Sequence, residues 1–368
     1  MNKNEIIQIQ GMEYKEMTKQ LLNKCALATL IPSKVSLIGI KPNLVAPVPA
    51  EFGGTTHPEV VAGIIEYLQE NGFTNLQIME GSWVGDKTEE SFEVCGYRML
   101  SEQYSVPLID AQKEKSMPVQ CGDMELQICE CAKKVDFMIN VPVMKGHCQT
   151  KITCALKNMK GLLPNKEKRH FHAMGLHRPI AHLGLGIHQD FILVDNICGD
   201  LDFEDGGNPF IMNRLFAGLD PVLIDAYVCA ELHYKPEDVP YVKMGVGSAD
   251  LTRLSIRQIG EIGEKRVIPE KRKIVELQDA VEEVESCSAC YGYLIPALDR
   301  LREEGLLQEL HEKICIGQGY RGKSGALGVG SCTSGFKYNL KGCPPTDEQM
   351  YEFLKQYIAT RRKTEAEK

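Results

Sequence analysis

Residues 35–79 read VSLIGIKPNLVAPVPAEFGGTTHPEVVAGIIEYLQENGFTNLQIM and contain a strand, a helix and a second strand in that order. The first run, VSLIGI (35–40), is short and nearly all apolar, which is typical of a strand buried on both faces. Apolar side chains then recur at helical spacing: Val60, Val61, Ile64, Ile65 and Leu68. Thr56 and Glu59 form the T-x-x-E pattern of a capping box, so we expect the helix to begin there.

The same order continues along the chain. FMINV (137–141) and FILVD (191–195) are further strand candidates. Strands that alternate with helices predict right-handed crossovers and therefore an α/β fold with a mostly parallel sheet and flanking helices. We expect this domain over residues 1–260, then a charged connector over 261–285, and then a smaller Cys-rich, cluster-binding region over 286–368.

Composition excludes several classes of protein. The 368 residues carry 50 acids and 42 bases, a net charge of −8, which argues against chain-wide binding of nucleic acid or an anionic membrane. The N-terminus lacks the apolar core of a signal peptide, and no apolar run approaches the ~20 residues of a membrane helix. We therefore expect a cytoplasmic protein with no nucleic-acid or membrane partner, and homo-oligomers stay open.

Fourteen cysteines are unusual in a chain without an export signal. Those before residue 230 are mostly scattered and are expected to be small buried residues. Near the C-terminus, Cys287 and Cys290 lie two residues apart, and Cys332 and Cys343 each lie close to glycine. Four thiolates suit either zinc or a [4Fe–4S] cluster, and the Cys-Pro ending favours the cluster. We predict a [4Fe–4S] cluster held by these four cysteines.

Cys315 is a fifth cysteine in the same region, and we expect it to be a buried strand residue. If the other four cysteines all bind iron, the cluster serves electron transfer or structure. If one of them does not, an open iron could act as a Lewis acid, as in a lyase or hydratase.

A basic, histidine-rich segment follows the strand at 137–141. Eight lysines and arginines and one acid lie between residues 143 and 178, and six of the nine histidines lie between 147 and 188. An open α/β sheet usually binds its ligand at this end of a strand, and positive charge there suits a carboxylate or phosphate. Histidine can move protons near neutral pH. The alternative is a solvated basic loop.

Three of the aspartates that follow this segment carry a prediction. Asp195 ends the predicted strand at 191–195, which favours a functional role. Asp220 precedes Pro221 and is expected to cap a helix. Asp225 would lie inside that apolar helix, where a buried carboxylate needs a partner, for which a lysine is the obvious candidate.

Five stretches of the chain together resemble the bacterial and archaeal family called domain of unknown function 362. They are IKPNLV (40–45), TTHPEVVAGIIEYLQENG (55–72), INVPVMKGHCQTKITCALKNMKGLLP (139–164), VDNICGD (194–200) and LDPVLIDA (219–226). Family members often show Lys-Thr-His where this chain has Lys145-Gly146-His147. The resemblance implies association with iron–sulfur ligand segments, although this tail lacks the dense ferredoxin run.

The resemblance also supplies candidate site residues. The catalytic candidates are Lys145, His147, His170 and Asp195. The substrate-binding candidates are Lys41, Asn43, Lys157, Asn158, Arg169 and Asp225. In this hypothesis Lys145, Lys157 and Arg169 hold the anion, His147 or His170 handles protons, and Asp195 orients one of the two histidines.

Together these features predict an iron–sulfur redox protein, an oxidoreductase that acts on a small anionic substrate with a ferredoxin or flavoprotein as redox partner. One alternative is a non-redox lyase or hydratase with an open-iron cluster. The other is an electron-transfer or structural partner that binds no substrate.

Overall fold

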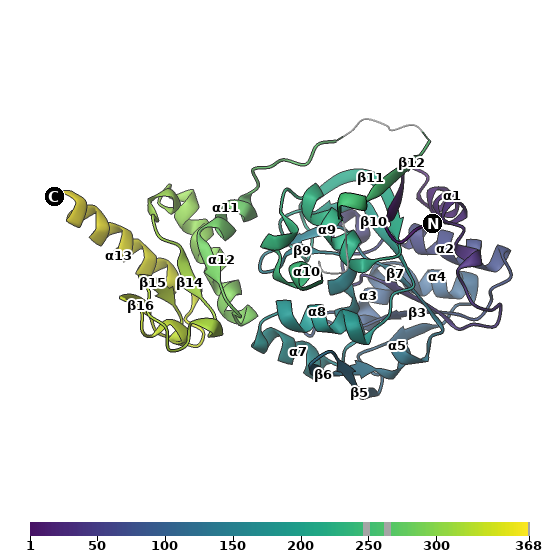
Figure 1. Cartoon of the computed structure of the whole chain (residues 1–368), viewed down its shortest axis with the longest axis horizontal. Coiled ribbons are helices and arrows are strands. Elements are labelled where there is room, and N and C mark those ends of the chain that lie inside the picture. The colour runs from purple at the N-terminus through teal and green to yellow at the C-terminus, as the bar shows by residue number, and fades with distance from the viewer. Residues whose placement is uncertain (246–250, 261–265, 367–368) are drawn as a thin grey trace. The chain divides into compact units, whose positions relative to one another are not determined.

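The computed structural model describes residues 1–245, 251–260 and 266–366. The chain folds into two compact units (Figure 1). The first unit contains residues 1–169 and 178–270, and the second contains residues 170–177 and 271–368. Within the described ranges, no helix is both long and apolar enough to cross a lipid bilayer.

An eight-stranded sheet forms the centre of the first unit. In spatial order its strands are β12 (Ser255–Ile259), β1 (Glu5–Gln10), β11 (Pro209–Gly218), β10 (Phe191–Asp200), β7 (Phe137–Val141), β2 (Ile38–Pro42), β3 (Leu76–Glu80) and β4 (Leu108–Asp110). The pairs from β10 through β7, β2 and β3 to β4 are parallel, and β11 is antiparallel to both its neighbours. The prediction of an α/β fold with a mostly parallel sheet is confirmed.

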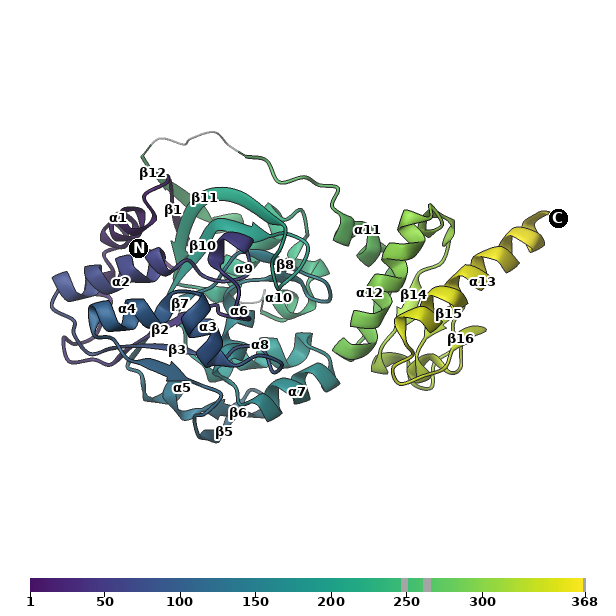
Figure 2. The same ribbon diagram turned by 180° about the vertical axis from the view of Figure 1, so that it is seen from behind.

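Helices cover both faces of this sheet. They are α1 (Tyr14–Cys25), α2 (Pro58–Glu70), α3 (Thr88–Val94), α4 (Tyr97–Tyr104), α5 (Glu130–Lys134), α6 (Ala155–Asn158), α7 (Asn165–Met174), α8 (His177–Gly186), α9 (Pro221–Glu231) and α10 (Pro240–Gly245). One apolar core joins α1, α2 and α4 to the sheet. Figure 2 shows α6 and α9 on the opposite side. Two hairpins complete the unit: β5 (Ser116–Cys121) with β6 (Met124–Cys129), and β8 (Lys145–His147) with β9 (Lys151–Thr153).

The start of α2 differs from the expected capping box. His57 occupies the N-cap position, with no side-chain cap, and Pro58 is the first helical residue. The Thr56 hydroxyl instead donates to the Val141 carbonyl at 2.8 Å and accepts from the Asn43 N–H at 2.8 Å. Because this side chain connects two strand ends, it is not available to the helix. The expected cap at Asp220 is confirmed, since its carboxylate accepts from the N–H groups of Val222 and Leu223.

The second unit contains a small parallel sheet and three helices. Its strands are β13 (Val281–Glu283), β14 (Ile314–Ile316), β15 (Leu327–Val329) and β16 (Tyr338–Leu340). Its helices are α11 (Lys273–Asp279), α12 (Ser288–Glu303) and α13 (Asp347–Ala366). The stretch YLIPALDRLREEGLLQELHEK (293–313) predicts an amphipathic helix broken near Pro296, but α12 continues through this proline. The helix buries Leu294, Ile295, Leu298 and Leu301, and this apolar packing outweighs the cost of the missing N–H.

Candidate functional site

Basic side chains gather where parallel strands of the large sheet end. Lys41 is the next-to-last residue of β2, and Glu80 is the last residue of β3. The chain that leaves β7 forms the β8–β9 hairpin, α6, the 3-10 helix η3 (Met159–Leu162) and the start of α7. Five lysines from these elements form what we call the lysine cluster: Lys41, Lys145, Lys157, Lys160 and Lys168. A ligand site at the carboxyl ends of strands is the usual arrangement of open α/β sheets.

Lys41 is fully buried, and its partners belong to the protein. Its Nζ atom lies 2.8 Å from Glu80 Oε1 and donates to the Pro42 carbonyl at 2.7 Å. Asn158 Nδ2 donates to Asn140 Oδ1 at 2.7 Å and to the Lys41 carbonyl at 3.2 Å. Burial lowers the pKa of Lys41, and the Glu80 carboxylate opposes that shift. Lys41 and Asn158 therefore bind neighbouring groups of the protein and hold this part of the site together.

Lys145 and Lys168 are also buried and hold loops. Lys145 Nζ donates to the carbonyls of Gly54 and Glu204, both at 2.6 Å. Lys168 Nζ donates to the carbonyls of Gly81 and Ser82 at 2.7 and 2.8 Å. Burial lowers the pKa of Lys145 to about 7 and the pKa of Lys168 to about 8. Sequence reasoning did not single out Lys168, because nothing in its local pattern separates it from the surface lysines beside it.

Lys157 and Lys160 are the half-buried members of the cluster. Lys157 Nζ donates to the Thr153 hydroxyl at 3.1 Å. Burial lowers the pKa of both lysines, and the neighbouring ammonium of Lys157 lowers that of Lys160 further. Desolvated ammonium groups that repel one another are stabilised by a bound anion.

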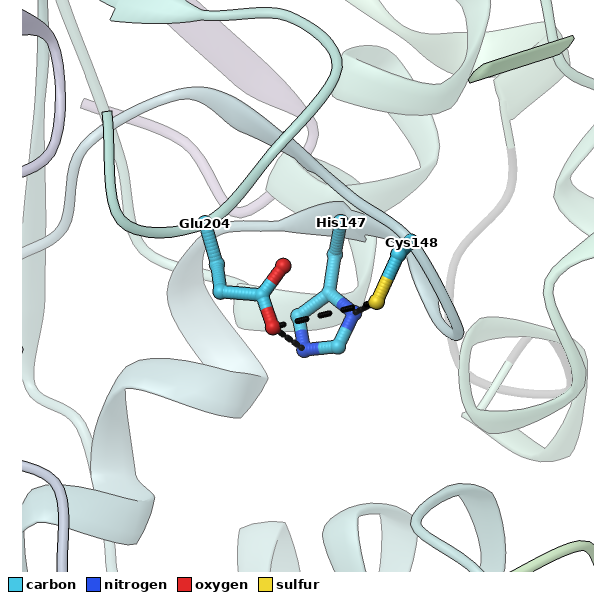
Figure 3. Close-up of side chains that lie close together, drawn as sticks. All are labelled: His147, Cys148 and Glu204. Carbon is cyan, nitrogen blue, oxygen red and sulfur yellow. Dashed lines mark hydrogen bonds and ion pairs between the residues drawn. The ribbon is translucent and has the colours of Figure 1, made fainter. Parts of the chain in front are cut away.

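The side chains of His147, Cys148 and Glu204 lie close together (Figure 3). His147 Nε2 is 3.4 Å from Glu204 Oε1, and Cys148 Sγ is 3.9 Å from the same oxygen. His147 Nδ1 accepts from the backbone N–H groups of Gln149 and Thr150 at 3.0 and 3.2 Å. The imidazole is buried, whereas Cys148 and Glu204 are half-buried. Glu204 was not among the candidate residues, since it belongs to a polar loop 57 positions away.

Asp195 lies in the middle of β10, because the strand runs to Asp200 instead of ending at residue 195. Its Oδ2 atom accepts from His57 Nδ1 at 2.9 Å and from the His57 N–H at 2.8 Å. Burial alone would lower the pKa of His57, but the Asp195 carboxylate raises it to about 10. Cys198 Sγ lies 3.9 Å from His57 Nε2. The sequence analysis did not assign His57, which occurs outside the histidine-rich segment.

The side chains of two other candidates, Asn43 and Asp225, accept hydrogen bonds from backbone N–H groups. Asn43 Oδ1 accepts from the Val45 N–H at 3.2 Å. Asp225 does not pair with a lysine as expected; its carboxylate accepts from the N–H groups of Ala155 and Leu156 at 2.7 and 3.1 Å. Burial raises the pKa of Asp225 to about 7, although these N–H donors oppose the shift. Arg169 and His170 are exposed on α7.

The four cysteines predicted as ligands come from three segments of the second unit. Cys287 is the N-cap of α12, and Cys290 lies in the first turn of that helix. Cys332 lies in the 3-10 helix η8 (Ser331–Thr333), and Cys343 follows β16. Ser331 donates to the Gly342 carbonyl through its N–H at 2.8 Å and through its hydroxyl at 2.9 Å, which joins the last two segments.

The pKa of Cys290 and the packing around its sulfur atom also indicate that these cysteines are neighbours. Burial raises the pKa of Cys290 to about 12, and the neighbouring thiols of Cys287, Cys332 and Cys343 contribute to the increase. Gly330 has a φ of +93°, and an added Cβ there would lie 3.4 Å from Cys290 Sγ. Glycine therefore leaves room beside the sulfur atoms, as a bulky metal centre requires.

Polar side chains also reach these sulfur atoms. Gln318 Nε2 donates to Cys287 Sγ at 3.4 Å, and the neighbouring Cys332 raises the pKa of Arg321. Cys315 lies on β14, and its neighbours are Tyr320 and Glu282. The four predicted ligands, with Gln318 as a donor to one of the sulfur atoms, have the chemistry of a four-thiolate centre that could hold a [4Fe–4S] cluster.

Two sequence comparisons with known proteins match this chain. A family model described as "Domain of unknown function (DUF362)" matches residues 38–230, which is more than half of the chain. The chain is 24% identical over 208 residues to the thylakoid-associated protein sll1697 of Synechocystis sp.. That match covers 55% of this chain and 64% of the relative, which is less than two thirds of the relative's length.

Among solved structures, the chain is similar to the lactate racemase apoprotein from Thermoanaerobacterium thermosaccharolyticum. The sequences are 14% identical, the TM-score is 0.42, and the match covers 61% of this chain and 56% of that chain.

Proposed function

This chain belongs to the family of domain of unknown function 362, and we propose that it is an iron–sulfur oxidoreductase for a small anionic substrate. In this proposal a [4Fe–4S] cluster on Cys287, Cys290, Cys332 and Cys343 accepts or delivers one electron. The lysine cluster binds the substrate, and a ferredoxin or flavoprotein is the electron partner.

The observation that carries the redox part is the convergence of four cysteines from three segments of the second unit. The cysteines span 57 positions of sequence, so their proximity is a property of the fold. The pKa values of half-buried Cys287 and Cys290 are raised by burial and by the neighbouring cysteines, and a bound cation would stabilise their thiolates, which are the ligands of iron. The hydrogen bond from Gln318 to Cys287 and the charge of Arg321 would tune the reduction potential of a bound cluster.

The lysine cluster supports the anionic substrate. Lys157 and Lys160 are half-buried, whereas Lys41, Lys145 and Lys168 are buried, so the ammonium groups of Lys157 and Lys160 are the best placed to contact a ligand from solvent. His147 is the candidate for proton transfer, with Glu204 as its acidic neighbour. Asp195 pairs with His57, and Arg169 and His170 remain predicted site residues.

The redox proposal is tested by anaerobic purification, iron and sulfide analysis, and electron paramagnetic resonance before and after dithionite. We expect about four irons per chain and a reducible signal, both lost in Cys290→Ser and retained in Cys315→Ser. Zinc, or absence of metal, would overturn the redox proposal. A stable cluster with one exchangeable iron would favour the lyase or hydratase.

The substrate proposal is tested by calorimetric titration with inorganic phosphate and malonate as probes. Removing one charged hydrogen bond costs about 1.5–3 kcal/mol, so Lys157→Ala should weaken binding about 10–100-fold without changing the iron content. Lys151→Ala is the matched control, since Lys151 lies over the Tyr234 ring. Unchanged affinity in Lys157→Ala would count against the pocket and favour an electron-transfer partner that binds no substrate.

A further inference from the structure

We propose that His147, Cys148 and Glu204 form a binding site for one divalent transition-metal ion, separate from the C-terminal cysteines. The three side chains each offer one ligand atom, and these atoms all lie within 4.8 Å of one another (Figure 3). Two of the ligands come from the end of β8 and the turn after it, and the third comes from the loop between β10 and β11. The site belongs entirely to the first unit.

The distances are close to those of a tetrahedral ion. Zinc binds histidine nitrogen and carboxylate oxygen at about 2.0–2.2 Å and sulfur at about 2.3 Å, which separates N from O by about 3.4 Å and S from O by about 3.6 Å. His147 Nε2 and Glu204 Oε1 are 3.4 Å apart. Cys148 Sγ and Glu204 Oε1 are 3.9 Å apart, which is a few tenths of an ångström more than the separation of S from O at zinc.

The hairpin orients the imidazole. Because Nδ1 accepts from the N–H groups of Gln149 and Thr150, the neutral ring carries its proton on Nε2, directed at Glu204. A metal ion that binds Nε2 requires the other neutral tautomer, so the ring proton moves to Nδ1 and the ring gives up the two hydrogen bonds from the Gln149 and Thr150 N–H groups. Loading one divalent ion at neutral pH therefore releases one proton, that of the Cys148 thiol.

Holding the loop in place does not require the Glu204 side chain. Lys145 Nζ already donates to the Glu204 carbonyl at 2.6 Å. The Asp200 carboxylate accepts from the N–H groups of Asp202, Phe203 and Asn208, which folds the loop back on itself. The Glu204 side chain is therefore available for a ligand, and it is directed at the histidine and the cysteine.

The ligand types indicate the class of ion. Nitrogen, sulfur and oxygen together suit borderline ions such as Zn²⁺, Fe²⁺ or Co²⁺, whereas Mg²⁺ and Ca²⁺ prefer oxygen alone. Three protein ligands leave a fourth position for water or substrate, as in catalytic zinc sites. The charge of Lys157 acts on both Glu204 and Cys148 and opposes the cation. An anion bound to that lysine removes this opposition, so metal and anion should bind cooperatively and by the same factor in both directions.

The test is anaerobic titration of the full-length metal-free chain with Co²⁺, followed by thiolate-to-cobalt absorption and by calorimetry in two buffers. Cys148→Ser, His147→Ala and Glu204→Gln should each lose one high-affinity equivalent, with affinity lowered more than about 100-fold, because removing a ligand exceeds the 10–100-fold effect of its supporting groups. Cys290→Ser should keep that equivalent while it disturbs binding at the C-terminal cysteines. Cys131→Ser is the control for a buried cysteine outside both sites.

Two results would overturn the inference. One is Co²⁺ binding that only the C-terminal cysteine variants change. The other is binding at this site with no proton release, since it would mean that the Cys148 thiol had kept its proton. Glu204→Gln keeps the size of the side chain, and its circular dichroism must match that of the unmodified protein. Iron and sulfide content reports on the proposed redox function separately.

Discussion

Burial determines what each lysine of the cluster can do. Taking an ammonium out of water is costly unless acceptors replace the lost hydration. Lys41 meets this requirement with Glu80, and Lys145 and Lys168 meet it with pairs of backbone carbonyls. Because the pKa values of Lys145 and Lys168 fall to about 7 and 8, the positive charge of the cluster decreases as pH rises through this range.

The buried pair of His57 and Asp195 predicts a pH-dependent contribution to stability. The pKa of His57 rises from 6.5 to about 10, so its stabilisation is fully present below pH 6.5 and is lost as pH increases toward 10. Urea unfolding at pH 6, 8 and 10 should show that the stability difference between the unmodified protein and His57→Gln shrinks across this interval.

Asp195→Asn is the companion variant, because it leaves the buried imidazole without its counter-charge. We expect it to lower the free energy of unfolding by about 3–5 kcal/mol at pH 7. Asp190→Asn, at a half-buried carboxylate near exposed His188, is the control. A stability difference for His57→Gln that does not change with pH would contradict the assigned ionisation.

At the scale of elements, helix ends and strand ends are connected by side chains distant in sequence. Asp225 of α9 accepts from the first N–H groups of α6 and thereby caps a helix 70 positions earlier. Thr56 connects the start of α2 to the end of β7. These contacts hold the hairpin and α6, which carry His147 and Lys157, in fixed positions above the sheet.

Helix α12 offers a prediction about backbone energetics. Pro296 is exposed within it, and proline in a helix interior costs about 3 kcal/mol relative to alanine. Pro296→Ala should therefore stabilise the second unit by about 1–3 kcal/mol, measured by chemical denaturation. Part of the gain is offset because the unfolded chain has more conformational freedom with alanine than with proline.

Gly292→Ala is a companion change in the same helix. An added Cβ at Gly292 has no atom within 4 Å, so this variant should gain about 1 kcal/mol from helix propensity alone. If Gly292→Ala stabilises the protein and Pro296→Ala destabilises it, the proline ring must contribute packing that the backbone argument ignores.

At the scale of the whole molecule, the two units differ in their source of stability. The first unit has an eight-stranded sheet with an extensive apolar core, whereas each strand of the second sheet contains three residues. Sheets of such short strands provide little independent stability. If a metal centre joins the three cysteine segments, its binding free energy becomes folding free energy of the second unit.

Metal removal should therefore affect the units unequally. After chelation of iron, hydrogen exchange measured by mass spectrometry should increase in residues 271–366 and in residues 170–177, which belong to the same unit. Exchange in β2 and β7 should not change. The metal-free Cys290→Ser protein is the matched control. Equal exchange with and without iron would show that the second unit is folded by its own packing.

The sequence alone determined the α/β class, the helix cap at Asp220 and the candidate cysteines, because strands, helices and ligand spacings are written in local patterns. It also located the basic segment, since that segment follows a recognisable strand. It missed the longer β10 and the uninterrupted α12, where pairing with β11 and burial of leucines outweigh local signals.

Only the tertiary structure determined which of these residues meet. The sequence separates His57 from Asp195 by 138 positions and His147 from Glu204 by 57, and no local pattern records either pair. Burial determines what each side chain can contact. Lys41 and Asn158 are buried and bind other groups of the protein, whereas Lys157 is half-buried at the surface of the cluster. The physical reason is that a charge acts according to its neighbours and its exposure to water, and both depend on how distant segments pack together.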